Sequence, residues 1–245
     1  MHLFISTLEP SGDLHASNLI RSFQRLHPDA KFVGLGGDKM QAVGADLLVN
    51  MIGHAVMGFG RVVGKIRFFK GVADRATRYF KDHRPDAVLM IDSSGFNLPL
   101  ARRAKEAGIP VYWFLPPQLW AWRGWRVRNL RKWVDHVVCA LPFEYDWYRS
   151  RHVPCSYAGH PYFDELEREV PDAAFIDEQR RRGGRVVALR PGSRKQEVSV
   201  NASSMLNSAG AIHERLPDTR FLVAAFNEEQ AAMMNEVVKR FDLPV

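Results

Sequence analysis

The segment Ala-Val-Leu-Met-Ile at residues 87–91 contains no polar position. A strand with one face in water alternates apolar and polar residues. A short unbroken apolar run is instead typical of a strand buried on both faces of a parallel sheet. Helices must cover both faces of such a sheet, so this segment predicts an α/β fold. The run ends at Asp92, and the small residues Ser93, Ser94 and Gly95 lead from there into a helical pattern.

The same order of short apolar strand, turn and helical pattern recurs along the first two thirds of the chain. Strands are predicted at residues 2–6, 31–35, 87–91, 111–115, 135–140 and 155–158. This alternation predicts six or seven parallel strands in one doubly wound domain. We therefore expect a Rossmann-like parallel-sheet domain at residues 1–167.

A second unit follows a charged stretch at residues 165–172 that contains Pro171. Two further strands, at residues 185–189 and 220–226, alternate there with three helices. Two strands are few for a doubly wound domain. We therefore expect residues 168–245 to be the incomplete start of a second Rossmann-like domain, in a chain truncated at its C-terminus.

The composition is that of a folded domain with a basic surface. The 245 residues are 46% hydrophobic and 25% charged, with a net charge of +7. This charge favours anionic partners such as nucleic acid, phosphorylated small molecules or an anionic membrane surface. Cys139 and Cys155 fit no metal or disulfide pattern, and Gly36-Gly37-Asp38 lacks the glycine spacing of a dinucleotide site. Because no signal peptide or run of roughly 18 apolar residues occurs, a cytosolic protein is expected.

Asp92 has two interpretations. Ligands of open α/β sheets bind beyond the carboxyl ends of the strands, and a carboxylate placed there is a candidate general base. Alternatively, Asp92 only caps the following helix, since aspartate and serine are favoured N-caps. This stretch taken alone favours the cap.

The segment at residues 51–72 combines apolar and basic residues. Apolar side chains recur at helical spacing, at Val62, Val63, Ile66 and Phe69, with Phe68 beside them and many lysines and arginines between them. This pattern is typical of an interfacial helix on an anionic bilayer. It also fits a surface helix packed on its own sheet, which is the more frequent case.

Two loops have compositions that favour ligand binding. Residues 116–126 carry three tryptophans and two arginines beyond a strand end, which suits a sugar ring, an anionic ligand or single-stranded nucleic acid. The turn Pro191-Gly192-Ser193-Arg194 opens a helix, where backbone donors and a guanidinium can bind a diphosphate. An ordinary loop is the alternative in both places.

Eight short motifs, taken together and in order, resemble those of the lipid-A-disaccharide synthases, which are bacterial inverting glycosyltransferases with the GT-B fold. The motifs are Ser11-Gly12-Asp13, Gly36-Gly37 with Met40, Val56-Met57-Gly58, Ile91-Asp92-Ser93 with Phe96-Asn97, Gln-Leu-Trp-Ala-Trp-Arg at 118–123, Leu-Pro-Phe-Glu at 141–144, Gly159-His160-Pro161 and Pro191-Gly192-Ser193-Arg194. The sequence departs from the family at Pro10 and at Ser94-Gly95, where a second carboxylate is usual.

The resemblance implies a function. An N-terminal domain would bind the acceptor 2,3-diacylglucosamine 1-phosphate, and a C-terminal domain would bind UDP-2,3-diacylglucosamine. A β-1,6 disaccharide 1-phosphate and UDP would form without a metal or other cofactor. The enzyme would lie on the cytoplasmic face of the inner membrane, against its anionic surface. The resemblance is also compatible with a homo-oligomer.

The resemblance also implies roles for individual residues. Asp92 would be the general base and Arg194 would stabilise the leaving diphosphate, as the two catalytic residues. Acceptor binding would fall to Glu9, Ser11, Gly12, Asp13, Asn97, Gln118, Trp120, Arg123 and His160. Gly192, Ser193 and Arg194 would hold the donor diphosphate. Val62, Val63, Ile66, Phe68 and Phe69 would contact the membrane.

Three other functions remain as alternatives to this synthase. A relative of UDP-N-acetylglucosamine 2-epimerase could use the same fold, but the Trp-Ala-Trp-Arg loop and the basic apolar helix argue against it. A fragment without catalysis could bind only lipid phosphate or membrane. A nucleic-acid binder would fit the charge and the tryptophans, but no recognised nucleic-acid motif is present, so no nucleic-acid partner is expected.

Overall fold

The chain forms two compact units, Met1–Arg168 and Glu169–Val245. The computed structural model describes residues 1–52, 62–241, 243 and 244, and only the backbone of residues 62–65. Residues 53–61 of the apolar and basic segment at 51–72, which include the motif at residues 56–58, lie outside the described residues. Each unit is described by itself below.

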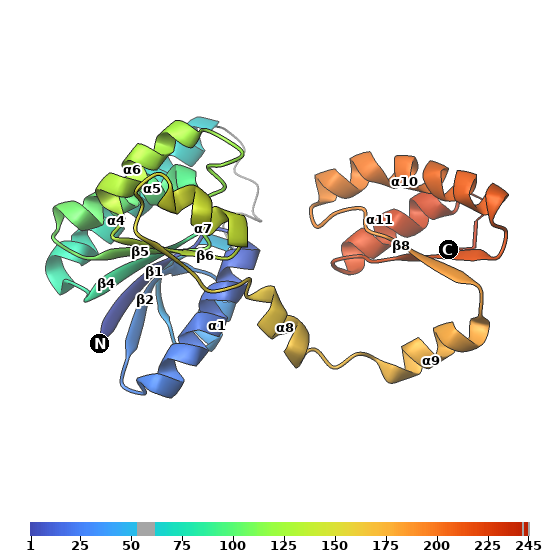
Figure 1. Ribbon diagram of the computed structural model, residues 1–245, viewed down its shortest axis with the longest axis horizontal. Helices are drawn as coiled ribbons and strands as arrows, with labels where there is room; N and C mark the ends of the chain where they lie inside the picture. Colours follow the sequence, from blue (N-terminus) through green and yellow to red (C-terminus); the bar gives the residue numbers. More distant parts are fainter. Residues whose placement is uncertain (53–61, 242, 245) are drawn as a thin grey trace. The chain divides into compact units, whose positions relative to one another are not determined.

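The first unit is built on a seven-stranded sheet (Figure 1). Its strands are β1 (His2–Ser6), β2 (Lys31–Gly36), β3 (Asp46–Asn50), β4 (Ala87–Ile91), β5 (Val111–Phe114), β6 (His136–Cys139) and β7 (Cys155–Tyr157). They run in the order β3-β2-β1-β4-β5-β6-β7, and every neighbouring pair is parallel. The predicted Rossmann-like α/β fold is thus confirmed. The apolar pattern did not predict β3, a half-buried edge strand.

Helices cover both faces of this sheet (Figure 1). They are α1 (Pro10–Leu26), α2 (Asp38–Ala42), α4 (Val62–His83), α5 (Ser94–Glu106), α6 (Val127–Trp133), α7 (Pro142–Arg149) and α8 (Tyr162–Arg168), with a 3₁₀ turn, η1 (Gly124–Arg126). Helices α4, α5 and α6 pack on one face, whereas α1 and α2 pack on the other. Two covered faces explain why the central strand β4 is apolar throughout.

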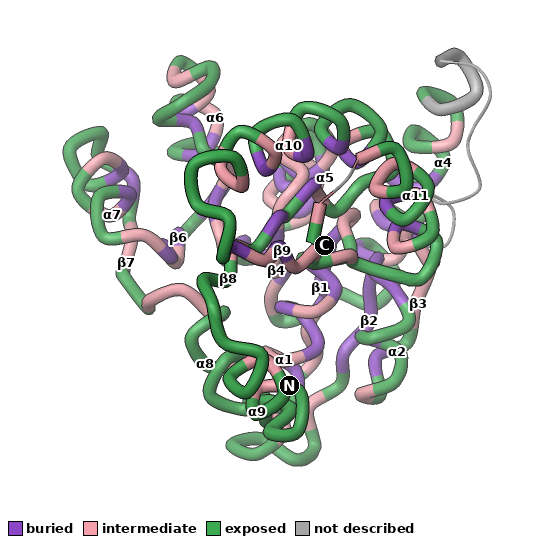
Figure 2. Tube along the Cα trace, turned by 90° about the vertical axis from the view of Figure 1, so that its right-hand side faces the viewer, coloured by how far each residue is buried: buried purple, intermediate pink, exposed green. Residues whose placement is uncertain are grey.

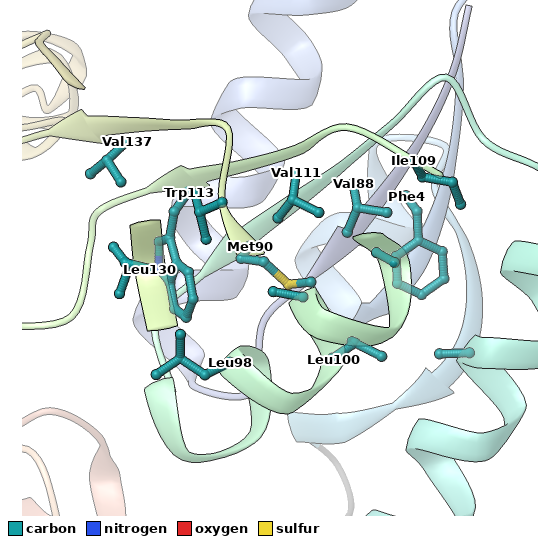
Figure 3. Close-up of a cluster of buried hydrophobic side chains, with 14 of the residues drawn as sticks. Phe4, Val88, Met90, Leu98, Leu100, Ile109, Val111, Trp113, Leu130 and Val137 are labelled. Carbon is teal, nitrogen blue, oxygen red and sulfur yellow. The ribbon is translucent and has the colours of Figure 1, made fainter. Parts of the chain in front are cut away.

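Alternate residues of each strand are buried in two hydrophobic cores, one on each face of the sheet. Phe4 and Met90 point to the face covered by α4, α5 and α6, while Ile5 and Ile91 point to the face covered by α1. Figure 3 shows Trp113 in the first core with Leu98 and Leu130 around it. Each fully buried side chain of this size contributes about 1.5–3 kcal/mol. These cores therefore fix the sheet, and with it the loops at its carboxyl edge.

The second unit contains a two-stranded parallel sheet, β8 (Arg185–Leu189) and β9 (Thr219–Val223). Three helices accompany it, α9 (Ala173–Arg182), α10 (Lys195–Arg215) and α11 (Glu228–Val238). Leu206 and Phe221 are buried at its centre. Most of β8 is exposed, as the green tube in Figure 2 shows, so these helices leave part of the small sheet uncovered.

Helix α4 combines the two interpretations that its sequence left open. Its second half packs on the sheet through Val72, Ala76 and Phe80. In its first half Ile66 is 65% exposed and Phe69 is 37% exposed, while Phe68 is partly buried against the core. The side chains of Val62 and Val63 lie outside the described part of the chain. No helix within that part is long and apolar enough to cross a bilayer.

Candidate active site

The candidate site lies where the strand order of the first sheet reverses. β1 has β2 on one side and β4 on the other, so the loops that follow β1 and β4 leave the sheet in different directions. In open α/β sheets this switch point is the usual ligand site. The loop after β1 carries Thr7 and Glu9, and the loop after β4 carries Asp92.

Asp92 is held by the loop that follows β1. The Thr7 hydroxyl donates a hydrogen bond to Asp92 Oδ2 at 2.5 Å. The backbone N–H groups of Leu8 and Glu9 donate to the same carboxylate, each at 3.3 Å. Asp92 and Ser93 have φ angles of 57° and 37°, in the left-handed region that aspartate tolerates better than most residues. This turn directs the carboxylate back over β1 instead of onto the first turn of α5, where no cap by a side chain is formed.

Burial makes Asp92 an unusually weak acid. Desolvation raises its pKa to about 6, against the lowering effect of the hydrogen bonds from Thr7 and Leu8, and the charge of Glu9 adds to the rise. A base is most effective when its pKa lies close to the working pH, because it is then both deprotonated and strongly basic. The carboxylate is thus suited to accept a proton near neutrality.

Gly12 allows the first turn of α1 to approach this carboxylate. A Cβ atom at Gly12 would lie 2.0 Å from Asp92 Oδ2 and 2.0 Å from Thr7 Oγ1. No real contact is that short, so only glycine fits the present arrangement. The Ser-Gly-Asp motif therefore requires its glycine for close packing and not for a special φ angle.

Asn97 supports the same turn from below. It is fully buried, and its Nδ2 atom donates to the carbonyl oxygens of Ile91 at 2.8 Å and of Asp92 at 3.2 Å. Its Oδ1 atom accepts from the Ser6 hydroxyl at 2.7 Å. Asn97 therefore ties the end of β4 to the end of β1, and its amide groups are used by the protein.

Asp13, on α1, is a second residue whose hydrogen bonds hold two elements together. Only 3% of it is exposed, and its carboxylate accepts hydrogen bonds from the backbone N–H groups of Gly37, Lys39 and Met40 at 2.8–3.1 Å. These are the otherwise unpaired donors at the start of α2. Asp13 thus fixes α1 against the turn after β2, away from the cavity that Asp92 lines.

A cavity of about 620 Å³ opens beside Asp92. Loops that follow β1, β4, β5, β6 and β7 all contribute to its wall. Of the residues predicted from the sequence, it brings together Glu9, Ser11, Gly12, Asp92, Gln118 and His160. Asp13, Asn97 and Trp120 do not line it, and Arg123 lines a neighbouring cavity of about 420 Å³ with Gln118 and Trp122.

The tryptophan loop is attached to α7. Trp120 Nε1 donates to Glu144 Oε1 at 3.1 Å, and the Trp120 ring packs edge-on against Phe143. Glu144 is buried, and its other oxygen accepts from the N–H of Leu141. These contacts join the Trp-Ala-Trp-Arg motif to the Leu-Pro-Phe-Glu motif and place Glu144 in the cavity wall.

His15 is a cavity residue that the sequence did not reveal. It is 5% exposed, and its Nδ1 atom has no hydrogen-bond partner among the described residues. Burial lowers the pKa of its imidazole, and the neighbouring His160 lowers it further. The Tyr162 ring lies edge-on to His15 at 5.0 Å and stacks on His160 at 5.1 Å. The only signal in the sequence is the spacing of His15 one helical turn after Gly12.

The predicted diphosphate turn belongs to the second unit. Glu197, in the first turn of α10, accepts hydrogen bonds from the N–H groups of Ser193 at 2.9 Å and Arg194 at 3.1 Å. Its other oxygen accepts from Arg194 Nη1 at 2.9 Å. These bonds lower the pKa of Glu197. A carboxylate of the chain itself thus occupies the donors that an oxyanion would use.

No group of three or more potential metal ligands occurs among the residues that the structure describes. Cys139 is buried and Cys155 is half-buried, and both are free thiols. Burial raises the pKa of Cys139 to about 12, which keeps it protonated and unreactive.

Comparison with known proteins assigns the chain to a family. The family model "Lipid-A-disaccharide synthetase" matches residues 3–245. A lipid-A-disaccharide synthase of Methylobacillus flagellatus is 38% identical over 242 residues, which are 97% of this chain and 64% of the relative. One of Coxiella burnetii is 36% identical over 88% of this chain and 57% of the relative. The chain thus spans about three fifths of the length of these curated relatives.

Solved structures are similar in fold at low sequence identity. The S. aureus MnaA-UDP co-structure covers 98% of this chain and 64% of its own, with a TM-score of 0.67 at 9% identity. A putative UDP-N-acetylglucosamine 2-epimerase from Listeria monocytogenes covers 99% and 67%, with a TM-score of 0.66 at 10% identity. At such identities the similarity shows the architecture alone.

Proposed function

Because this chain belongs to the lipid-A-disaccharide synthetase family, we propose that it supplies the acceptor side of a lipid-A-disaccharide synthase. The reaction transfers 2,3-diacylglucosamine from UDP-2,3-diacylglucosamine to the 6-hydroxyl of 2,3-diacylglucosamine 1-phosphate. The observation that carries this proposal is the partly buried, desolvated Asp92 carboxylate in a cavity at the switch point of the sheet.

The chemistry proposed for Asp92 is a single displacement. Its carboxylate accepts the proton of the acceptor 6-hydroxyl while that oxygen bonds to the anomeric carbon of the donor. The bond from this carbon to the diphosphate oxygen breaks, its electron pair leaves with UDP, and the configuration inverts. One base aligned with the attacking hydroxyl suffices for this step. Thr7 and Asn97 keep the carboxylate in place.

Acceptor contacts are proposed for the polar residues that line the cavity. Glu9, Ser11, Gln118 and His160 offer hydrogen-bond partners for sugar hydroxyl or amide groups. His15 adds an imidazole whose lowered pKa favours the neutral form, with one donor and one acceptor. Asp13 and Trp120 act through the elements they hold in place.

The second unit is proposed to contact the diphosphate of the donor through Gly192, Ser193 and Arg194. Arg194 would neutralise the charge that develops on the leaving group. Because Glu197 accepts hydrogen bonds from the same backbone donors, the donor would have to displace this carboxylate or bind to the remaining groups of the turn.

A product assay distinguishes this function from the epimerase alternative. The chain is joined at residue 245 to the remaining C-terminal segment of the M. flagellatus relative and given both lipid substrates. We expect UDP release that depends on the acceptor, together with a tetraacyl disaccharide 1-phosphate detected by mass spectrometry. Conversion of UDP-N-acetylglucosamine to its 2-epimer without an acceptor, and no disaccharide, would contradict the proposal.

A peripheral position on an anionic membrane, at the cytoplasmic face, is proposed from α4. The exposed Ile66 and Phe69 lie on a helix whose described residues include Arg67 and Lys70, which suits contact with lipid. The lipid nature of the proposed substrates requires access of this kind.

Vesicle binding tests this surface. Replacing Ile66 and Phe69 together by serine is expected to weaken binding of the chain to phosphatidylglycerol vesicles roughly thirtyfold, since each replacement removes a side chain that contributes about 1 kcal/mol when partly buried in the bilayer. The matched control replaces Phe163 and Leu166 of α8 by serine, because both are strongly exposed. Equal binding by both double variants in a flotation assay would remove α4 from the proposed interface.

A further inference from the structure

Three neighbouring cavities form a row that starts at the carboxyl edge of the first sheet and continues between α5 and α6. The cavity of Asp92 shares Ser94, Pro117 and Gln118 with the cavity of about 420 Å³ that Arg123 lines. That second cavity shares Ser94 and Arg126 with a third, of about 510 Å³, between α5 and α6. Ser94 borders all three, so a ligand beside Asp92 can extend towards the arginines.

The electrostatic character changes along this row. Among the residues that the structure describes, those that line the Asp92 cavity include Glu9, Asp92 and Glu144 but no lysine or arginine. The described residues of the second cavity include Arg123 and Arg126 but no carboxylate. A phosphate group is therefore repelled at the first cavity and attracted at the second, since like charges at short range in a protein oppose each other strongly.

Other arginines in the row are already paired. Arg102 forms an ion pair with Glu106 at 2.7 Å, and Arg103 forms one with Asp74 at 2.7 Å. Arg123 and Arg126 form no ion pair with any carboxylate in the part of the chain that the structure describes. Their charges are thus available to a ligand.

The backbone places these two arginines together. Arg123 precedes the 3₁₀ turn η1 and Arg126 ends it, and the N–H of Arg126 donates to the carbonyl of Arg123 at 2.9 Å. Both arginines line the second cavity. The Arg126 guanidinium also lies 5.6 Å from the centre of the Trp125 ring, a cation–π contact that leaves its N–H edge able to donate. Guanidinium groups are preferred partners of phosphate, and this cavity carries two of them.

We propose that Arg123 and Arg126 bind the anomeric phosphate of the acceptor, with the sugar beside Ser94 and the 6-hydroxyl towards Asp92. This assignment rests on the proposed function and adds an orientation to it. The reversed orientation would place the phosphate among three carboxylates and is disfavoured. The row of cavities thus selects both a phosphorylated acceptor and the hydroxyl that reacts.

Binding to the 245-residue chain tests the phosphate site without the donor. Glucosamine 1-phosphate, which is water-soluble, is titrated by calorimetry against the chain and against a variant with Arg123→Gln and Arg126→Gln. We expect the Kd to rise at least tenfold. The matched control carries Arg128→Gln and Arg131→Gln, two exposed arginines of α6 that line none of the three cavities, and its Kd should change less than twofold. Equal losses in both double variants would overturn the proposal.

Two competition experiments show whether the site prefers a sugar phosphate to free phosphate or to a lipid headgroup. Inorganic phosphate and phosphatidylglycerol vesicles should compete with glucosamine 1-phosphate only weakly, because they lack the sugar beside Ser94. Competition at equal concentration would show a general anion or lipid-headgroup site and would contradict the acceptor assignment.

The chimaera with the M. flagellatus segment separates this proposal from the proposed function. For it we measure the ratio of kcat/KM for the phosphorylated acceptor to that for its dephosphorylated form. The Arg123→Gln/Arg126→Gln variant should lower this ratio at least tenfold, a result that partial misfolding cannot produce. An active chimaera with an unchanged ratio would refute the phosphate site alone. Arginine-dependent binding by the chain, with an inactive chimaera, would refute the proposed function alone.

Discussion

Replacing Asp92 by asparagine is expected to reduce disaccharide formation by the chimaera about 10²- to 10⁴-fold, the usual contribution of a general base. Asparagine preserves the shape of the side chain, and its carbonyl oxygen can still accept from Thr7. It cannot take the proton of the acceptor hydroxyl. The measurement is the rate of acceptor-dependent UDP release, with the disaccharide identified by mass spectrometry.

The matched control is Asp29→Asn, in an exposed turn between α1 and β2, which should leave the rate unchanged. Near-normal turnover in the Asp92→Asn variant would leave Asp92 only the structural role of holding the loop after β1.

The same substitution is expected to stabilise the fold at neutral pH. The pKa of Asp92 is raised from 3.8 to about 6 by burial, so the folded state disfavours the carboxylate. Below about pH 4 Asp92 is protonated in both the folded and the unfolded state, so its ionisation does not lower the stability of the fold. As the pH rises from about 4 to about 6, the unfolded chain loses this proton while folded Asp92 keeps it. The folded state thereby loses up to about 3 kcal/mol of stability, since one pKa unit corresponds to about 1.4 kcal/mol. Asparagine carries no such penalty.

Urea unfolding of the 245-residue chain checks this sign. The Asp92→Asn variant should be about 1–3 kcal/mol more stable than the original chain at pH 7.5, and the difference should vanish near pH 4. A variant that loses stability at pH 7.5 would show that the carboxylate serves the fold. Gain of stability together with loss of turnover is the signature of a functional base.

Replacing Gly12 by alanine is expected to damage both the fold and the site. The added Cβ would lie 2.0 Å from Asp92 Oδ2 and from Thr7 Oγ1, which are hydrogen-bonded to each other. Overpacking of this kind costs about 1–3 kcal/mol, more than the gain of up to about 1 kcal/mol from a better helix former. The carboxylate must move, and turnover should fall at least about 10²-fold because general-base catalysis depends on position.

Gly71→Ala is the control for Gly12→Ala. Gly71 lies in α4, and its Cβ would meet no atom within 4 Å, so the variant should be unchanged or more stable by up to about 1 kcal/mol. Thermal unfolding and the UDP-release assay measure both effects. A Gly12→Ala variant as stable and active as Gly71→Ala would mean that the first turn of α1 does not position the carboxylate.

The periodicity of the sequence predicts the sheet well but leaves its edge incomplete. Unbroken apolar runs such as residues 87–91 identify strands buried on both faces, because parallel sheets require covered faces. This criterion does not identify β3, since β3 is half-buried at the edge of the sheet and its sequence is not apolar throughout. Helix α4 extends beyond Val72 to His83, because Val72, Ala76 and Phe80 recur at helical spacing and are buried against the sheet.

Motifs identify important residues in the site without showing what each one contacts. Asp13 and Asn97 belong to such motifs, but their hydrogen bonds join elements more than twenty residues apart. His15 carries no local signal of its burial in the cavity wall. Arg126 is one of many arginines in its region, and only the tertiary structure shows that it shares a cavity with Arg123 and has no ion pair among the described residues.

The pKa of Asp92 tests most directly whether its carboxylate is suited to act as the general base. Side-chain carboxyl carbons of ¹³C-labelled aspartate in the 245-residue chain are titrated by NMR, and the Asp92 signal is assigned by its loss in the Asp92→Asn variant. We expect a pKa of about 6 that shifts when glucosamine 1-phosphate is added. A pKa near 3.9, the value of an ordinary exposed aspartate, with no response to the sugar phosphate would contradict this expectation.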